Sequence, residues 1–380
     1  MRTRCQREHC ETDVLVIGGG PAGCALAVAA AASGLSVVVL ERSQYEAPRV
    51  GEHLTPDAQP TLAALGVLDR IHAGRHRRCA GVRCVWGDET LYDRDYLFNV
   101  SGHGWNLDRE QFDIMLAETA TRAGAEVLTG TQLAACSACG SGWTAQLRGG
   151  LRHGQTIKAR FLVDATGRAA TVARRLGSQR RALDKLVALC AWLPSAKPAR
   201  GHPERLLIEA IETGWWYTTQ ISGDRSVAVF LSDRDLVPSG AAGAINEWTE
   251  KLTRTRHVKT LIELGAPATV FRSRAADSYI LDPVAGEHWL AVGDAAAAYD
   301  PLSSVGILKA LRHGIAAACT IARALAGDRG AWSAHMQAVN QEFARYVAER
   351  QFYYASEKRW PDQPFWRRRR VAQASATRSE

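Results

Sequence analysis

Three glycines at a fixed spacing separate an apolar run from an alanine-rich segment near the start of the chain. They are Gly18, Gly20 and Gly23, and Ala22 lies within the same turn. In such a motif the first glycine permits a tight turn, the second lets the backbone approach a pyrophosphate, and the third lets a helix pack closely on a strand. The free N–H groups that begin the following helix can bind phosphate oxygens. The motif therefore predicts a dinucleotide site.

An acidic residue lies where the second strand of this unit should end. Glu41 follows the apolar run 36–40 and comes 18 residues after Gly23. A carboxylate at this place can bind both hydroxyl groups of an adenosine ribose. Strand, glycine turn, helix, strand and acid in this order predict a right-handed βαβ unit. They leave open whether the dinucleotide is FAD or NAD.

Two later apolar runs each end in a turn that contains aspartate and glycine. The first turn holds Asp164 and Gly167, and the second holds Gly293 and Asp294. Either turn alone would be an ordinary Asp–Gly turn. Each could also bring backbone groups and a carboxylate to a bound dinucleotide.

The elements that must position these residues follow from the hydrophobic pattern. The pattern predicts buried strands at 13–17, 36–40, 158–163 and 289–292, and helices at 22–33, 108–122 and 306–326. Between about 187 and 233, apolar runs separated by polar turns predict antiparallel strands. The chain is therefore expected to be an α/β protein. Its dinucleotide-binding core is built from scattered segments and carries a β-rich insertion.

Composition excludes several classes of protein. Of the 380 residues, 46% are hydrophobic and 23% are charged, as in an ordinary globular protein. No apolar run approaches the roughly 18–20 residues that span a bilayer. The nine cysteines are an odd number in a chain too large to need disulfides, so we expect reduced thiols and a cytoplasmic location. The net charge of +8 is modest and predicts no nucleic-acid partner, although basic clusters at 75–78 and 367–370 could steer an acidic protein.

Three motifs in order carry a family resemblance. Gly-Gly-Gly-Pro-Ala-Gly at 18–23 with Glu41–Arg42, Asp-Ala-Thr-Gly at 164–167 and the stretch 293–306 resemble the flavoprotein monooxygenases and flavin-dependent halogenases with a single FAD-binding domain. The similarity covers most of the chain. It implies a glutathione-reductase-type flavoprotein fold, with a Rossmann-like FAD-binding domain and an inserted β-sheet-rich substrate domain. The implied boundaries are 1–75, 106–183 and 270–330 for the FAD domain, 76–105 and 184–269 for the substrate domain, and 331–380 for a C-terminal helical segment and basic tail.

The resemblance also implies how FAD is held. Asp294 would contact the ribitol, and Pro301 to Gly306 would lie against the isoalloxazine. The helix that starts at Gly306 would point its N-terminus at the N1–C2=O edge of the flavin. Arg109 matches the arginine that reaches the phosphates, and Arg49 belongs to an Arg-Val-Gly-Glu segment beside the flavin. The cofactor residues so implied are Gly18, Gly20, Ala22, Gly23, Glu41, Arg42, Arg49, Arg109, Asp164, Gly167, Asp294, Pro301, Gly306 and Ile307.

Shorter stretches are similar to one branch of this superfamily. They are 51–56, 102–109, 214–217 and 359–362, and they look like the maturation flavoproteins of lysine and glycine oxidases and of quinohemoprotein amine dehydrogenase. This implies a monooxygenase that hydroxylates a tryptophan of a partner protein through a flavin C4a-hydroperoxide formed with O₂. No second glycine motif is visible, so NAD(P)H would bind transiently or an external reductant would act.

Candidate catalytic and substrate residues follow from the same resemblance. His53 and Glu52 beside the flavin are acid/base candidates, although a histidine here is more often structural, and Cys79 is a third catalytic candidate at the border of the site. Trp215, Trp216 and Tyr217 lie on the sheet that roofs the flavin in this fold, and alternation sends Trp216 to the opposite face from its neighbours. Only some of the three can then touch a substrate.

One position bears on the choice between halogenation and hydroxylation. Tryptophan halogenases carry a lysine a short distance past the Gly-Glu segment and a Trp-x-Trp-x-Ile-Pro run. The closest match to the lysine here is Cys79, and the tryptophan run is absent. Both losses favour direct oxygen transfer. The alternatives are a monooxygenase or halogenase acting on a free small aromatic molecule, an isoprenoid flavin reductase, and a flavin-binding protein without catalysis.

Overall fold

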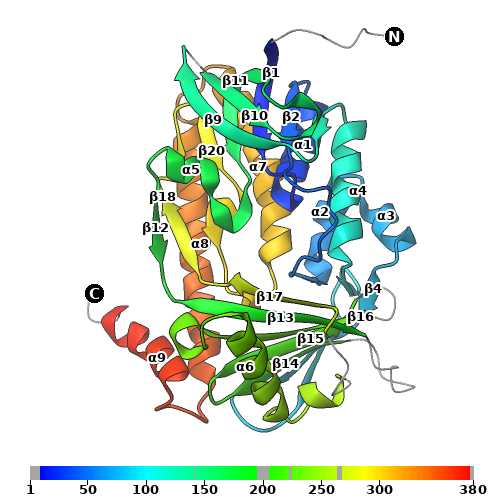
Figure 1. The fold of residues 1–380 in the computed structure, drawn as a ribbon, viewed down its shortest axis with the longest axis vertical. Helices are drawn as coiled ribbons and strands as arrows, with labels where there is room; N and C mark the ends of the chain where they lie inside the picture. The colour runs from blue at the N-terminus through cyan, green and yellow to red at the C-terminus, as the bar shows by residue number, and fades with distance from the viewer. Residues whose placement is uncertain (1–8, 141, 195–204, 222–224, 263–267, 377–380) are drawn as a thin grey trace.

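The computed structural model describes residues 9–140, 142–194, 205–221, 225–262 and 268–376. Two large sheets dominate it, and Figure 1 shows the mostly parallel sheet with its helices above the mostly antiparallel one. The long helix α8 (Ala331–Ser356), orange in Figure 1, runs along both. The predicted α/β class, a Rossmann-like core with a sheet-rich insertion, is confirmed.

The parallel sheet has the strand order β19-β20-β11-β1-β2-β8, with β10 and β9 joined to β11 in antiparallel fashion. Its central strands are covered on both faces, which explains why they are continuous apolar runs rather than alternating ones. The strand bounds are β1 (His9–Ile17), β2 (Val37–Leu40), β8 (Glu126–Leu128), β9 (Gln132–Cys139), β10 (Gly142–Arg148), β11 (Thr156–Asp164), β19 (Ala285–Gly286) and β20 (Trp289–Ala291).

The helices of this half bring two N-termini to the same edge of the sheet. α1 (Pro21–Ala32) and α7 (Gly306–Leu325) pack against each other, and a Cβ on Gly314 would overlap the carbonyl oxygen of Ala22. α4 (Arg109–Arg122) packs on α1 and begins at Asp108, whose carboxylate accepts hydrogen bonds from the backbone N–H groups of Glu110 and Gln111. The shorter helices are α2 (Gln59–Ala64), α3 (Leu68–Ala73) and α5 (Thr171–Arg175).

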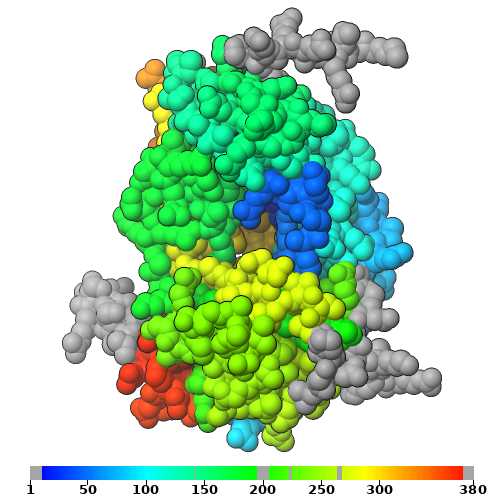
Figure 2. Space-filling model, in the orientation of Figure 1, coloured from blue at the N-terminus to red at the C-terminus, as the bar shows by residue number. Residues whose placement is uncertain are grey.

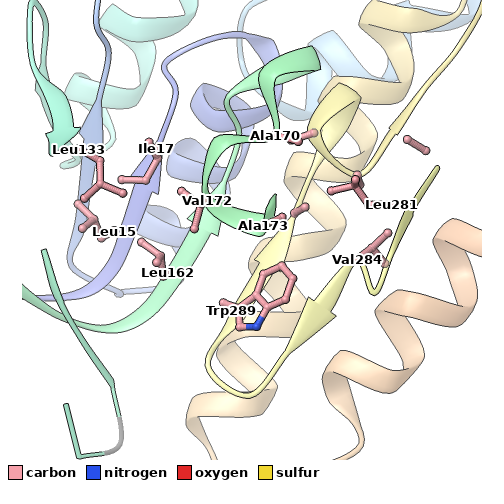
Figure 3. Packing of buried hydrophobic residues seen from close by; sticks show 14 of the residues in the cluster. Leu15, Ile17, Leu133, Leu162, Ala170, Val172, Ala173, Leu281, Val284 and Trp289 are labelled. Carbon is pink, nitrogen blue, oxygen red and sulfur yellow. The ribbon is translucent and has the colours of Figure 1, made fainter. Parts of the chain in front are cut away.

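The core of this half is a layer of aliphatic side chains between the sheet and its neighbours. Figure 3 shows Leu15 and Leu162 from adjacent strands facing Val172 of α5, with Trp289 and Leu281 beside them. All of these side chains are buried. The smaller sheets are β12 (Gln179–Ala182) with β18 (Tyr279–Asp282) and β21 (Ala297–Ala298), and β3 (His53–Leu54) with β7 (Gly104–Asn106) and β4 (Arg77–Cys79).

The second large sheet has the order β17-β13-β16-β15-β14-β5-β6, and all its neighbours are antiparallel except β14 and β5. Its strands are β5 (Gly81–Val85), β6 (Tyr92–Asp95), β13 (Leu186–Pro194), β14 (Arg205–Ile211), β15 (Gly214–Gln220), β16 (Arg225–Asp233) and β17 (Val270–Ala275). One face is covered by α6 (Ala241–Thr253), and the other faces the parallel-sheet half. Because β17 pairs with β13, this sheet extends past residue 269; the division into domains stays a prediction.

The C-terminal segment differs from the expected basic tail. Residues Pro364–Ala376 form a further helix, α9, which is docked by ion pairs. Arg369 is buried and its Nη2 lies 2.8 Å from Asp233 Oδ1, while Arg368 Nη1 lies 2.8 Å from Asp235 Oδ1. Asp233 at the end of β16 and Asp235 just after it thus pair with two arginines of the basic cluster 367–370 and dock the helix that carries them. No helix in the described part of the chain combines the length and apolar character needed to cross a bilayer.

Candidate functional site

The glycine turn between β1 and α1 leaves open space where a pyrophosphate would lie. A Cβ on Gly18, which has φ +113°, would overlap the backbone of Ala165, and one on Gly23 would overlap the carbonyl oxygen of Gly18. A Cβ on Gly20 would meet nothing within 4 Å. Gly18 and Gly23 are thus required for packing, whereas Gly20 faces free space beside the unpaired N–H groups that begin α1. Ala22, in the first turn, is buried against α7.

Glu41 closes the second side of this turn. Its Oε2 accepts the N–H of Gly19 at 2.9 Å, and its Oε1 accepts the N–H and hydroxyl of Ser43 at 3.0 and 2.5 Å. Arg49 joins the cluster, with Nη2 at 3.4 Å from Glu41 Oε1 and Nη1 at 2.8 Å from Asp113 Oδ2. The Arg49 guanidinium is thus held beside the predicted ribose position. Arg42 is exposed.

The two Asp–Gly turns have different roles in the protein. Asp164 is buried, and its carboxylate accepts hydrogen bonds from the N–H and hydroxyl of Thr166 and from the N–H groups of Val172 and Ala173, at 2.7–2.9 Å. Its carboxylate therefore caps the start of α5, which leaves the backbone of the turn for a cofactor. Gly167, with φ +63°, has open space at its Cα.

Asp294 is the carboxylate that faces the predicted cofactor space, with about a third of its side chain exposed. Its Oδ1 lies 2.8 Å from Nζ of Lys309, which is buried on the first turn of α7 and also donates to the carbonyl oxygen of Ala297. Burial alone would raise the pKa of Asp294, but the charges of Lys309 and Arg168 outweigh it and lower this pKa. The partner of Lys309 is thus Asp294, a predicted cofactor ligand.

The segment before α7 forms a tight turn. Pro301 begins a single 3-10 turn (Pro301–Ser303), Ser304 is left-handed with φ +54°, and α7 starts at Gly306. A Cβ on Gly306 would meet nothing within 4 Å, and Ile307 is buried against α1 and its neighbours. A second set of unpaired helix N–H groups therefore faces open space, as the flavin edge requires.

Arg109 ties these segments together. It is the first residue of α4, and its Nη1 donates to the carbonyl oxygens of Val50 and Gly51 at 2.6 and 3.3 Å. Its charge lowers the pKa of both Glu52 and Asp294, so it lies within electrostatic reach of both. Segments far apart in sequence thus converge on one space, and Figure 2 shows a hollow in the middle of this face, between the blue segment after β2 and the yellow and light-green segments below it.

Among the acid/base candidates, Glu52 has the more suitable environment. It is buried, its Oε2 accepts the N–H of Gly51 at 3.0 Å and the hydroxyl of Tyr217 at 3.2 Å, and its Oε1 has no hydrogen-bond partner among the described residues. Burial raises its pKa to about 7. Removal of a carboxylate from water penalises its charged form, so this group can exchange a proton near neutral pH.

His53 and Cys79 are less suitable. His53 Nδ1 lies 3.2 Å from the amide oxygen of Asn106 and Nε2 lies 2.9 Å from the hydroxyl of Tyr96, so both ring nitrogens are engaged. Burial lowers its pKa to about 4, which makes it a neutral, positioned ring at physiological pH. Cys79 is fully buried, with its thiol 3.2 Å from the carbonyl oxygen of Gly81.

The inner face of the second sheet forms a roof over the convergent segments. Trp215 and Tyr217 lie on this face, in an apolar cluster that also includes Val50 and Leu302. Trp216 is on the opposite face, buried against Phe230 of β16 and Trp248 of α6, so it cannot touch a substrate here. The predicted alternation is confirmed. Trp215 is itself buried and its indole N–H donates to Tyr354, which leaves Tyr217 as the roof aromatic joined to Glu52.

Several residues of the site were not found from the sequence. They are Tyr96 and Asn106, which hold His53, and Asp300, which caps the turn before α7. Asn106 and Asp300 lie in stretches that carry the family resemblance, but neither was singled out. Asp300 carries one recognisable signal, since aspartate followed by proline is typical of an N-cap followed by the first helical position. Tyr96 and Asn106 carry none, because their contacts with His53 join distant segments.

The fold and these two helix N-termini define a dinucleotide-binding flavoprotein. The model of the FAD binding domain family matches residues 11–351, and the chain belongs to that family. It is an FAD-dependent enzyme of the oxidoreductase and halogenase class.

Three similar proteins place it further. LodB of Marinomonas mediterranea, a proposed FAD-dependent oxidoreductase, is 28% identical over 368 residues, covering 95% of this chain and 98% of LodB. The tryptophan 2-halogenase of Chondromyces crocatus is 28% identical over 334 residues, covering 83% of this chain and 62% of the halogenase. The solved structure of QhpG, a peptidyl tryptophan dihydroxylase essential for tryptophylquinone cofactor biogenesis, has a TM-score of 0.78 at 24% identity, covering 95% of this chain and 79% of QhpG, which shows a shared fold.

The residues present fit FAD. The open Cα positions of Gly20 and Gly306, each beside a helix N-terminus, suit the pyrophosphate and the flavin edge. Glu41 and Asp294 offer carboxylates at the predicted ribose and ribitol positions. When bound and reduced, FAD would supply redox electrons that no side chain of the chain can provide.

Proposed function

We propose that the protein is an FAD-dependent monooxygenase that hydroxylates an electron-rich aromatic ring, a tryptophan side chain of a partner protein, during the biogenesis of a quinone cofactor. O₂ and a reductant, either NAD(P)H or an external donor, would be consumed. The observation that carries hydroxylation is Cys79, a fully buried thiol at the position where the resemblance to tryptophan halogenases would require an accessible lysine. Lys309, near the same space, is committed to Asp294.

The residues around the site support a proton-handling role for Glu52. Oxygen addition to an aromatic ring leaves a carbon that must lose a proton before the ring is aromatic again. The unpartnered Oε1 of Glu52 can accept that proton, while Tyr217 holds Oε2. The apolar roof around Tyr217 keeps water away from this space, which favours transfer of oxygen to the ring over its loss as H₂O₂.

An exposed loop supports a protein substrate. The loop between Tyr96 and Gly104 carries Leu97 and Phe98, which are 80% and 92% exposed, and the fully exposed Val100. Apolar side chains grouped in this way mark protein contact sites. The loop begins and ends beside the residues that hold His53, next to the candidate site. QhpG, whose fold this chain shares, is itself a peptidyl tryptophan dihydroxylase.

Mass spectrometry tests the proposal. The FAD-loaded enzyme, a reductant and O₂ are incubated with a quinoprotein precursor that has an unmodified tryptophan, and a gain of one or two oxygen atoms on that residue is expected. Free tryptophan under the same conditions serves as the comparison. No oxygen gain on the precursor together with ordinary turnover of free tryptophan would overturn the protein-substrate assignment.

Halogenation of a small aromatic molecule is the second candidate, because the Chondromyces crocatus tryptophan 2-halogenase is as similar in identity as LodB. Chloride and bromide are therefore added in parallel reactions. Halogen incorporation into free tryptophan or indole would favour this candidate, and oxygen incorporation alone would exclude it.

A further inference from the structure

A buried chain of hydrogen bonds joins the roof to the turn that precedes α7. The indole N–H of Trp215 donates to the hydroxyl of Tyr354 at 3.0 Å, and this hydroxyl donates to Oδ2 of Asp300 at 2.7 Å. Oδ1 of Asp300 accepts the backbone N–H of Leu302 at 3.0 Å. The side chains of Trp215, Tyr354 and Asp300 are each about 1% exposed. Water therefore cannot replace any member of the chain.

The chemistry of the three groups fixes the direction of the chain. An indole N–H can only donate, and an ionised carboxylate can only accept. The single hydrogen of the Tyr354 hydroxyl must then point to Asp300, while its oxygen accepts from Trp215. Arg350 supports the ionised carboxylate, with Nε at 3.5 Å from Asp300 Oδ2. One orientation of the Tyr354 hydroxyl hydrogen satisfies both the indole N–H and the carboxylate oxygen, so this chain of bonds is positionally well defined.

The turn at the end of this series of hydrogen bonds is held partly by residues of α8. Ser304 adopts φ +54°, a left-handed conformation that costs a non-glycine residue roughly 1 kcal/mol or more. The hydrogen bond from Leu302 to Asp300 closes the turn locally, while the bonds from the N–H of Asp300 to the hydroxyl of Tyr346, at 2.7 Å, and from the hydroxyl of Tyr354 to Asp300 tie it to α8. Gly306 follows directly, so the placement of the turn decides where the free N–H groups of α7 point.

We propose that Tyr354 is a positioning residue: through Asp300 it sets the 301–306 turn and the N-terminus of α7 against the flavin, and through Trp215 it fixes that turn relative to the substrate roof. Residues that lie outside the FAD family motifs, on the last turns of α8, thus adjust the flavin site. The inference rests on the FAD chemistry of the proposed function. It does not depend on which aromatic ring is oxidised, so its tests are separable from the substrate assignment.

Tyr354→Phe tests the proposal in the full-length protein. The variant removes one oxygen atom and keeps the ring, which contacts Arg350 and Arg369 at 4.8 and 4.9 Å and packs on Trp366. Trp215 N–H and one Asp300 oxygen are left without their partner. We expect the Kd for FAD to rise about tenfold and the visible absorption bands of the bound flavin to shift. Tyr353→Phe, on the same helix turn but with a half-exposed side chain, is the matched control and is expected to change neither.

A second variant separates positioning from general destabilisation. Trp215→Phe removes the first link and part of a buried ring but leaves the bond between Tyr354 and Asp300 in place, so a smaller rise in Kd, of about threefold, is expected. The double variant should resemble Tyr354→Phe alone, because both changes act on one series of bonds. Thermal unfolding of the FAD-free proteins is recorded in parallel.

Two results would overturn the proposal. One is a Kd for FAD within twofold of the parent value and an unchanged flavin spectrum in Tyr354→Phe. The other is a lower Tm of Tyr354→Phe measured without FAD, together with an unaltered absorption spectrum of the flavin once FAD is bound. That result would show that the hydroxyl only stabilises the fold. If Tyr354→Phe fails to fold, Trp215→Phe decides by the same two readouts. Loss of precursor hydroxylation with normal flavin binding would count against the proposed function instead.

Discussion

Replacement of Glu52 by glutamine should make the protein more stable, and only at neutral and alkaline pH. Glu52 is buried and its pKa is raised from the ordinary 4.5 to about 7. Because a tenfold change in proton affinity corresponds to about 1.4 kcal/mol, ionisation of Glu52 costs the folded state about 3 kcal/mol relative to the unfolded chain. Glutamine has nearly the same shape and carries no charge.

The sign of the pH dependence follows from the direction of the pKa change. The folded protein binds the Glu52 proton more tightly than the unfolded chain does, so the contribution of Glu52 to the free energy of unfolding is fully present at pH values below about 4. Its contribution falls as the pH rises from 4.5 to 7 and is constant above that. The amide of glutamine adds an offset that is independent of pH. The difference in stability between Glu52→Gln and the parent protein should therefore grow by about 3 kcal/mol between pH 4 and pH 8.

Urea unfolding of the FAD-free protein, followed by tryptophan fluorescence, measures this difference at several pH values. For a chain of 380 residues the same 3 kcal/mol corresponds to about 4 °C in Tm. Tyr217→Phe is a matched control, because it removes a hydrogen bond that lowers the pKa of Glu52. In this variant the pH range over which the contribution of Glu52 to stability falls should move to higher pH. Parallel stability curves for Glu52→Gln and the parent protein across this range would refute the argument that Glu52 is a neutral-range acid.

Three further predictions concern the cofactor side and the C-terminus. Gly20→Ala should keep the parent Tm but weaken FAD binding at least tenfold in a fluorescence titration, because the new Cβ enters the open space. Gly23→Ala should lose about 3 kcal/mol of stability, because there the new Cβ overlaps the backbone of Gly18. Lys309→Met should cost about 2 kcal/mol in urea unfolding at pH 8, less than for a fully buried pair because its partner carboxylate is 34% exposed. This deficit should shrink only below about pH 4, as the pH falls through the lowered pKa of Asp294. Arg369→Met leaves buried Asp233 with the weaker partner Arg368, so α9 should become sensitive to limited proteolysis, and an unchanged digestion pattern would contradict its docking role.

The fold was predictable where its signals are local. The glycine turn, the alanine-rich helix and the two flanking apolar strands lie within about thirty residues, and each is found within a few residues of its predicted position. Cys136 and Cys139, by contrast, lie in a polar segment where the hydrophobic pattern predicts no strand, yet both belong to β9. Pairing with β10 overrides the weak polar signal there, since strand formation depends on the neighbouring strand as much as on the segment itself.

The candidate site was predictable only as far as backbone chemistry reaches. A phosphate is bound by glycines and helix N–H groups, which leave a pattern in the sequence. Glu52 and Tyr217 are 165 positions apart, and their hydrogen bond exists only because the roof folds over the 49–52 segment. The same limit affected Asp164, because a carboxylate after a strand has the same sequence signature whether it faces a cofactor or caps a helix, as it does here.

Two buried carboxylates beneath the roof are therefore assigned different tasks by their surroundings. Burial raises the pKa of both Glu52 and Asp300, but Arg350 lies 3.5 Å from Asp300 and opposes the effect there. Asp300 also has both oxygens hydrogen-bonded, to Tyr354 and Leu302, whereas Oε1 of Glu52 has no partner among the described residues. Asp300 has a guanidinium nearby and donors on both oxygens, which favours a fixed acceptor, whereas the charge of Arg109 and two donors on one oxygen leave the pKa of Glu52 at about 7. Environment, rather than residue type, is therefore expected to make Asp300 a fixed acceptor beside the 301–306 turn and Glu52 a group that exchanges a proton.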